Sequence, residues 1–139
     1  MRGLRLLEML GRMNHILRWE PLPILQEREI SPTEMMVMRR IHKEDSCRVT
    51  DLACGVHIPP STMTGVLDRL VARGWLERVP ATDDRRSIIM KTTPALHEIM
   101  NELIELIDKK IADIFISYPE NDYNRLLFDL EQALHFLEE

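Results

Sequence analysis

The sequence has 139 residues, of which 45% are hydrophobic and 29% are charged, and its formal net charge is −5. This composition is typical of a single folded domain and excludes a disordered chain, and no apolar run approaches the roughly 20 residues that a membrane-spanning helix needs. We therefore expect one cytoplasmic domain over residues 1–139, with no membrane partner.

The N-terminal segment predicts an amphipathic helix that ends before two closely spaced prolines. Apolar side chains recur in it at steps of four, three and four residues, namely Leu6, Leu10, Met13 and Leu17. Residues 32–43 are the next predicted helix. Ser31 is its expected N-cap, proline suits its first position, and Glu34 lies three residues after the cap.

Two short helices are predicted in the middle of the chain. Thr50 is the expected cap of a helix over 51–55, and two prolines at 59–60 begin another helix. Gly74 is the expected C-terminal stop of this second helix, because glycine adopts the left-handed conformation that commonly ends a helix.

A β-hairpin is predicted next. Residues 75–79 and 87–91 are short, apolar and rich in β-branched side chains, and the segment between them is polar. Two helices joined by a turn and followed by a hairpin form a winged helix-turn-helix, here over residues 31–92. The predicted fold class is therefore mainly α-helical with a small β-hairpin, and its second short helix is expected to enter the major groove of DNA.

Residues 94–139 predict two further amphipathic helices. Thr93 and Pro94 begin the first, and Pro119 precedes the second. Together with residues 1–20 they flank the central unit and have little else in one chain to bury against. A two-fold homodimer would bury their apolar faces, so we expect both terminal segments to form a dimer interface.

The first turn of the predicted recognition helix offers short hydroxyl side chains for DNA. Ser61, Thr62 and Thr64 can bond phosphates or base edges, and Arg69 and Arg73 further along are placed for the DNA backbone. Hydroxyl groups at a helix start are more often caps, and the hairpin that follows favours the DNA interpretation.

The tip of the predicted hairpin carries a second set of DNA-binding candidates, Asp84, Arg85 and Arg86. A guanidinium group inserted into a narrow minor groove gains from the negative potential there, and Asp84 is placed to hold Arg86 extended. The alternative is a solvated turn. The acidity does not argue against DNA, because residues 93–139 carry eleven Asp and Glu against three Lys and Arg, whereas residues 61–92 carry four against six.

Three sequence motifs resemble the MarR (multiple antibiotic resistance regulator) family. They are Leu67-Asp68-Arg69-Leu70, Arg73-Gly74-Trp75-Leu76-Glu77-Arg78, and Asp84-Arg85-Arg86 followed five residues later by Thr92-Thr93. The resemblance implies a dimeric winged helix-turn-helix, with Ser61, Thr62 and Thr64 in the major groove and Arg86 in the minor groove. Gly65 departs from the family, which often has a long polar side chain at that position.

The resemblance also implies a small effector, often aromatic or phenolic, that binds between the dimer-forming and DNA-binding parts. Candidate lining residues are Met13, Leu17, Trp19, Met35, Met38 and Met100. The alternative for each of them is an ordinary core adapted by flexible methionines.

Other chemistry is not favoured by the sequence. The five histidines are scattered, and no nucleophile and base pair, phosphate loop or metal motif occurs, so we expect neither an enzyme nor a cofactor. Cys47 is expected in a loop beside Arg48, where a lowered pKa would suit an oxidation switch; the alternative is an incidental thiol. Cys54 is expected in the core.

These observations predict a homodimeric repressor that binds a pseudo-palindromic DNA operator, with possible release by a small ligand. The alternative is a winged-helix module that binds proteins and has no sequence-specific affinity for DNA.

Overall fold

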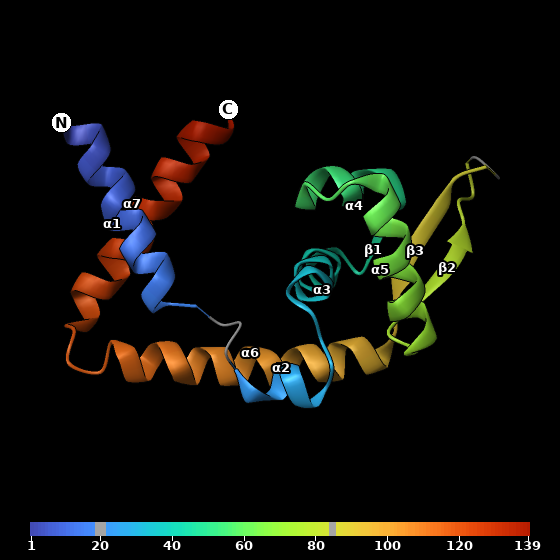
Figure 1. Ribbon diagram of the computed structural model, residues 1–139. Helices are drawn as coiled ribbons and strands as arrows, with labels where there is room; N and C mark the ends of the chain where they lie inside the picture. The colour runs from blue at the N-terminus through green and yellow to red at the C-terminus, as the bar shows by residue number, and fades with distance from the viewer. Residues whose placement is uncertain (19–21, 84–85) are drawn as a thin grey trace. The chain divides into compact units, whose positions relative to one another are not determined.

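The computed structural model describes residues 1–18, 22–83 and 86–139. They form two compact units, Met1–Ile107 and Asp108–Glu139, whose boundary falls inside one long helix (Figure 1). The elements of the first unit are α1 (Arg2–Ile16), α2 (Pro23–Glu27), α3 (Pro32–Glu44), β1 (Ser46–Arg48), α4 (Val49–Val56), α5 (Pro60–Ala72), β2 (Leu76–Pro80) and β3 (Ile88–Thr92). Helix α6 (Pro94–Ile114) crosses the boundary and α7 (Glu120–Glu138) follows.

Helix α3 begins as its sequence predicts, and α4 does not. The backbone N–H of Glu34 donates to Ser31 Oγ at 3.1 Å, which confirms the serine cap. The predicted cap at Thr50 is wrong, because α4 already begins at Val49 with Arg48 as its N-cap residue. The preceding residues, Ser46–Arg48, form strand β1, which the sequence did not predict. Helix α4 follows this strand directly and so begins earlier than predicted.

Helix α5 is amphipathic, and the residues predicted to begin and end it lie at its two ends. Pro59 is the N-cap residue and Pro60 takes the first helical position. Gly74 has a φ of +74°, a conformation that a side chain would strain, and this confirms it as the stop signal. The buried face of the helix consists of Met63, Val66, Leu67 and Leu70.

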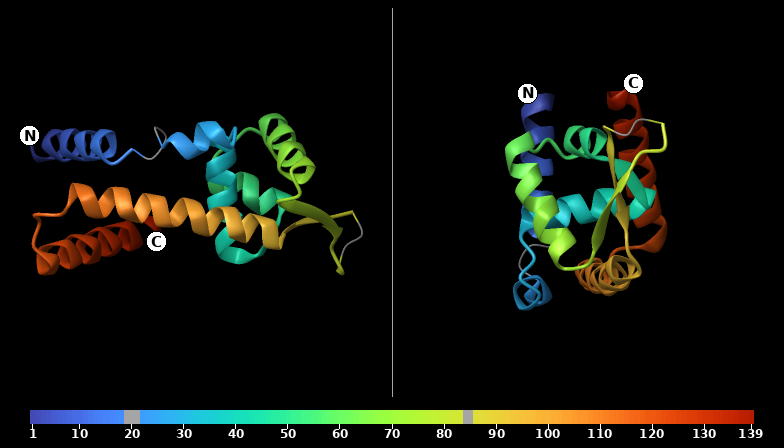
Figure 2. Two further views of the ribbon diagram at one scale, coloured as in Figure 1. Left: turned by 90° about the horizontal axis from the view of Figure 1, so that it is seen from below. Right: turned by 90° about the vertical axis from the view of Figure 1, so that its right-hand side faces the viewer.

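The hairpin of β2 and β3 belongs to a three-stranded antiparallel sheet of order β1-β3-β2. The two strands predicted from the sequence each begin and end one residue too early. The short β1 strand, which pairs Cys47 with Met90, was not predicted. Strands β2 and β3 project beyond the helices of their own unit, as Figure 1 and the left view of Figure 2 show. We call this projection, residues 76–83 and 86–92, the wing.

One methionine-rich core holds the winged unit together. Residues of α3, α4, α5, the sheet and the first half of α6 meet in it, and Met35, Met38, Met63, Met90 and Met100 are all at most 1% exposed. Flexible methionine side chains fill the irregular spaces between helices that meet at different angles.

Helices α1 and α7 bury no residue among those described. Large apolar side chains on both are exposed to solvent, namely Leu4, Leu6, Leu7, Met9, Leu10 and Ile16 on α1, and Leu127, Phe128, Leu130, Leu134, Phe136 and Leu137 on α7. Among the described residues, no helix combines the length and the apolar character needed to cross a membrane.

Two methionines on α3 give a matched test of this core. Met38 is fully buried and Met36 is 44% exposed. We expect Met38→Ala to lower the free energy of unfolding by about 2–5 kcal/mol, through lost burial and a residual cavity, and Met36→Ala by less than about 1 kcal/mol. Urea denaturation measures both; equal losses would place the packing core elsewhere.

Candidate nucleic-acid interface

The solvent-facing side of α5 carries the predicted hydroxyl residues. Ser61, Thr62 and Thr64 are exposed, on the side of the helix opposite its buried face. No side chain caps α5, so the capping alternative does not hold for this helix. Thr64 Oγ1 donates to the carbonyl of Pro60 at 3.1 Å, whereas Ser61 and Thr62 have no hydrogen-bond partner among the described residues. The N-terminal half of α5 therefore offers two unengaged hydroxyl groups to a ligand.

Arg69 in the C-terminal half of α5 and Arg73, its C-cap residue, turn toward the protein. Arg69 Nε donates to Glu34 Oε1 at 3.2 Å, and the Arg69 side chain remains 55% exposed. Arg73 donates to the backbone carbonyls of Arg28 and Glu29, at 3.0 and 2.5 Å, and is only 25% exposed. Their contact with the DNA backbone stays a prediction, and in this structure both bind within the chain.

Glu34 is a component of this region that the sequence indicated only as part of a helix cap. Its side chain is 5% exposed, accepts from Ser31 Oγ at 3.2 Å and lies 3.7 Å from Arg73, in addition to its bond from Arg69. A buried carboxylate needs such partners, because an unpaired buried charge costs several kcal/mol. Nothing in the sequence pairs residue 34 with residues 69 and 73, so only the fold reveals this contact.

Gly65 gives the Arg69 side chain room. A Cβ at residue 65 would meet Arg69 Nη1 at 3.6 Å, which is ordinary van der Waals contact. Alanine would fit there, and a long side chain would compete with the guanidinium for the same surface. The departure from the family pattern at this position is therefore coupled to the route that Arg69 takes toward Glu34.

The wing is tied to the body of its unit by Arg48, a second residue that the sequence analysis missed. Arg48 Nη2 donates to Asp83 Oδ2 at 2.5 Å, across 35 residues of sequence. Arg48 and Arg86 also line one groove of about 270 Å³, together with Val49, Thr50, Ser87 and Ile88. The structure thus brings the start of α4 next to the returning arm of the wing.

The predicted wing residues are only partly described. Arg86 is exposed at the end of the loop, and its contact with DNA stays a prediction. Asp84 and Arg85 lie outside the described residues, so the proposed bond between Asp84 and Arg86 stays a prediction.

The predicted effector residues separate into two groups. Met35, Met38 and Met100 are at most 1% exposed and belong to the core, which is the alternative that the sequence left open. Met13 and Leu17 are half-buried, in or directly after α1, and Trp19 lies outside the described residues. These six residues remain a predicted ligand set, and three of them pack tightly as core.

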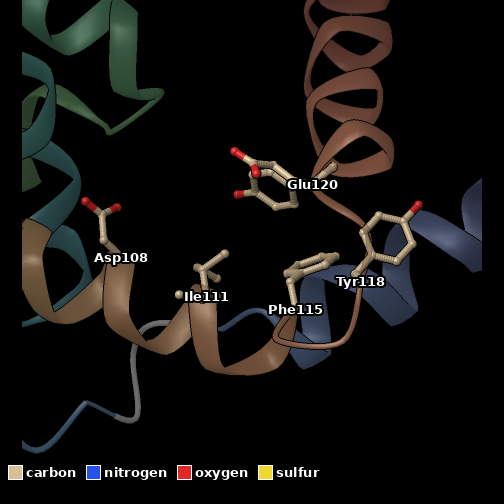
Figure 3. Close-up of a pocket in the computed structure, with 7 residues that line it drawn as sticks. Asp108, Ile111, Phe115, Tyr118 and Glu120 are labelled. Carbon is tan, nitrogen blue, oxygen red and sulfur yellow. The ribbon is translucent and has the colours of Figure 1, made fainter.

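A separate hollow of about 440 Å³ lies in the second unit. Its lining residues are Asp108, Ile111, Ala112, Phe115, Tyr118, Glu120 and Tyr123. The Phe115 ring packs edge-on against Tyr118 and Tyr123, with centroids 5.5 and 5.1 Å away, and Figure 3 shows Phe115 and Tyr118 at the bend between α6 and α7. Aliphatic and aromatic side chains make up most of this lining, and Asp108 and Glu120 add two carboxylates.

The cysteines correct two predictions. Cys47 lies in β1, and burial raises the pKa of its thiol, which the neighbouring Glu44 carboxylate raises further. The predicted loop position and lowered pKa are therefore wrong. Cys54 is exposed, so its predicted place in the core is also wrong.

Two of the scattered histidines meet in space. The Nδ1 atoms of His42 and His97 lie 3.0 Å apart, and His97 Nε2 is 3.1 Å from an Asp45 carboxylate oxygen. Across the described parts of the chain, no three His, Cys, Asp or Glu side chains are grouped so that they could hold a metal ion.

A helix-turn-helix with an exposed polar face, followed by an arginine-bearing hairpin, defines the winged-helix class. Residues 30–88 match the model of the MarR family. The chain is 28% identical over 101 residues to the uncharacterized regulator YpoP of Bacillus subtilis, covering 73% of this chain and 72% of YpoP. It is 26% identical over 106 residues to the multiple antibiotic resistance protein MarR of Escherichia coli, covering 73% and 74% of the two chains.

Solved structures share the whole fold. A MarR family protein from Bacillus stearothermophilus superposes with a TM-score of 0.81 at 22% identity, over 96% of both chains. An Escherichia coli MarR mutant complexed with operator DNA gives 0.66 at 22% identity, over 94% of this chain and 91% of that one. NadR in complex with 4-hydroxyphenylacetate gives 0.70 at 23% identity, over 96% and 92%. The chain is therefore similar to MarR regulators, in sequence over its winged unit and in fold over nearly its whole length.

The ion pairs of α5 predict unequal costs of removal. Glu34→Ala removes a carboxylate that is 5% exposed and accepts from Arg69 and Ser31, and we expect a loss of about 2–3 kcal/mol in the free energy of unfolding. Asp68→Ala removes a bond to Arg78 between side chains that are 59% and 37% exposed, and should cost less than about 1 kcal/mol. Urea denaturation compares the two; equal costs would show that the Glu34 contacts contribute no more than a surface pair.

The two cysteines should differ in reactivity. The thiolate is the form that reacts, so burial and the raised pKa predict slow alkylation of Cys47 near neutral pH and a rate that climbs only at higher pH. Exposed Cys54 should react first with iodoacetamide, as read by mass spectrometry, and Cys54→Ser should leave only the slow site. Faster modification of Cys47 in the folded wild-type protein would contradict the burial.

Proposed function

We propose that this chain is a homodimeric repressor that binds a pseudo-palindromic site on double-stranded DNA. The observation that carries the proposal is the exposed face of α5, where the hydroxyl groups of Ser61 and Thr62 are free of partners among the described residues. In helix-turn-helix proteins the second helix lies in the major groove, with its N-terminal residues at the base edges. Among the structural neighbours, the Escherichia coli MarR mutant is complexed with operator DNA.

The wing supplies the second contact in this proposal. Arg86 is exposed, and the bond from Arg48 to Asp83 holds the other side of the same loop. Residue 83 then has less conformational freedom to lose when an arginine enters the minor groove, so more of the contact energy remains for binding. Arg85 is proposed to contact DNA from the same loop.

Dimerisation is supported by surfaces that a single chain leaves exposed. Neither α1 nor α7 buries a residue among those described, although both are amphipathic. Their charges are complementary: Arg2, Arg5 and Arg12 outnumber Glu8 on α1, and α7 carries an excess of Asp and Glu. A second copy would cover these faces and the open hollow beside Phe115, and a two-fold axis would match the symmetry of a pseudo-palindromic DNA site.

A small aromatic or phenolic effector is the regulatory part of the proposal, and NadR complexed with 4-hydroxyphenylacetate is the neighbour that supports it. A ligand shifts the DNA-binding equilibrium only if it prefers one arrangement of the two recognition helices, whose half-sites lie about 34 Å apart. A site that uses Met35, Met38 or Met100 requires the core to open, because these side chains have almost no exposed surface.

Arg86 gives the mutational test of the wing. We expect Arg86→Ala to weaken binding to the operator by about 1–3 kcal/mol, a loss of roughly five- to 150-fold in affinity, because one cationic groove contact disappears. Arg125→Ala removes a highly exposed arginine from α7 and should leave the affinity within about twofold. Wild-type affinity in Arg86→Ala would remove the wing from the mechanism.

The alternative function is a winged helix that binds protein. A gel-shift assay with the DNA upstream of the coding sequence distinguishes this alternative from a DNA-binding regulator. A regulator should bind this DNA more tightly than a scrambled duplex, and log affinity should fall linearly with log salt concentration. No binding at low salt would overturn the proposed function.

A further inference from the structure

Helices α3 and α4 enclose a groove that the proposed DNA interface does not use. Its volume is about 250 Å³. Four of its lining residues come from α3 and three from the end of α4, namely Met36, Arg39, Arg40, Lys43, Gly55, Val56 and His57. The lining thus combines three formally cationic side chains and an exposed imidazole with the apolar side chains of Met36 and Val56.

Most of these polar groups lack a partner within the chain. Arg39, Lys43 and His57 are exposed, and none of them forms a hydrogen bond or an ion pair with another described residue. Arg39 and Lys43 are four residues apart on one helix, a spacing at which like charges repel and weaken the helix slightly. An anion in the groove would turn this repulsion into attraction.

Arg40 is held in place before any ligand arrives. Its Nη1 donates to Glu44 Oε1 at 2.5 Å, and the guanidinium group crosses the backbone of α4 at Gly55. A Cβ at residue 55 would come within 2.6 Å of Arg40 Nε, so this route is open only because residue 55 is glycine. The Nε atom is buried without a partner among the described residues, and the side chain as a whole is 37% exposed.

We propose that this groove binds a phosphate group. Arg39, Arg40 and Lys43 together exceed the single Glu44 carboxylate by two positive charges, and forked guanidinium donors beside an ammonium group match the several oxygens of a phosphate. The phosphate comes either from the DNA backbone or from a free phosphorylated small molecule. The first helix of a helix-turn-helix crosses the DNA backbone, and α4 is that helix here, which favours DNA.

Two measurements on the full chain test the groove, with Arg39→Gln and Lys43→Gln as variants. Lys109→Gln is the matched control, since Lys109 is exposed on α6 and carries the same charge. In the first measurement, inorganic phosphate is titrated into each protein in chloride buffer while the amide signal of Gly55 is followed by NMR. In the second, the slope of log DNA affinity against log salt concentration is determined, and this arm alone rests on the proposed function.

Binding of inorganic phosphate that weakens at least tenfold in both variants, but not in Lys109→Gln, supports a site for a free phosphorylated molecule. A salt slope that falls by about 0.9 in each variant and stays unchanged in the control supports a backbone phosphate of DNA. The proposal is overturned if phosphate leaves the Gly55 signal unmoved and the salt slopes of the variants equal that of the control. If the wild-type chain binds no DNA, the phosphate titration decides, so failure of the proposed function is distinguishable from failure of this site.

Discussion

The buried carboxylate of Glu34 joins helices α3 and α5 through its side-chain contacts. It accepts from Arg69 on α5 and from Ser31 at the start of α3, and Arg73 lies 3.7 Å away. Arg73 in turn donates to the backbone carbonyls of residues 28 and 29, just before α3 begins. Burying a charge is expensive, and these contacts to Glu34 Oε1 and near Oε2 offset part of that cost where α5 packs on α3.

This constraint divides α5 into two functional halves. At the C-terminal end, the side chains of Arg69 and Arg73 bind other groups of the protein, whereas Ser61 and Thr62 in the N-terminal half are exposed. Gly65 lies between the halves and leaves space for Arg69 to fold toward Glu34. In the proposed complex, base contacts therefore come from the first turns of α5, and Arg86 of the wing supplies a cationic contact.

Local signals in the sequence predicted much of the fold, whereas contacts between distant residues escaped it. The cap at Ser31 and the stop at Gly74 depend on a few neighbouring residues, so the sequence reveals them. Strand β1 has three residues and exists only because β3 pairs with it, and its presence invalidates both the loop at Cys47 and the cap at Thr50. The inward course of Arg69 and Arg73 depends on Glu34, 35 or more residues earlier, and no local pattern carries that information.

The central claim is that two copies of this winged helix act together on one DNA site. Sedimentation of the purified chain with a duplex from its own upstream DNA measures this most directly, because it reports the mass of the free protein and of the complex. We predict a free dimer and a complex of two chains per duplex, with no species of one chain per duplex at any ratio of protein to DNA. A monomer that binds the duplex one to one with full affinity would contradict the account.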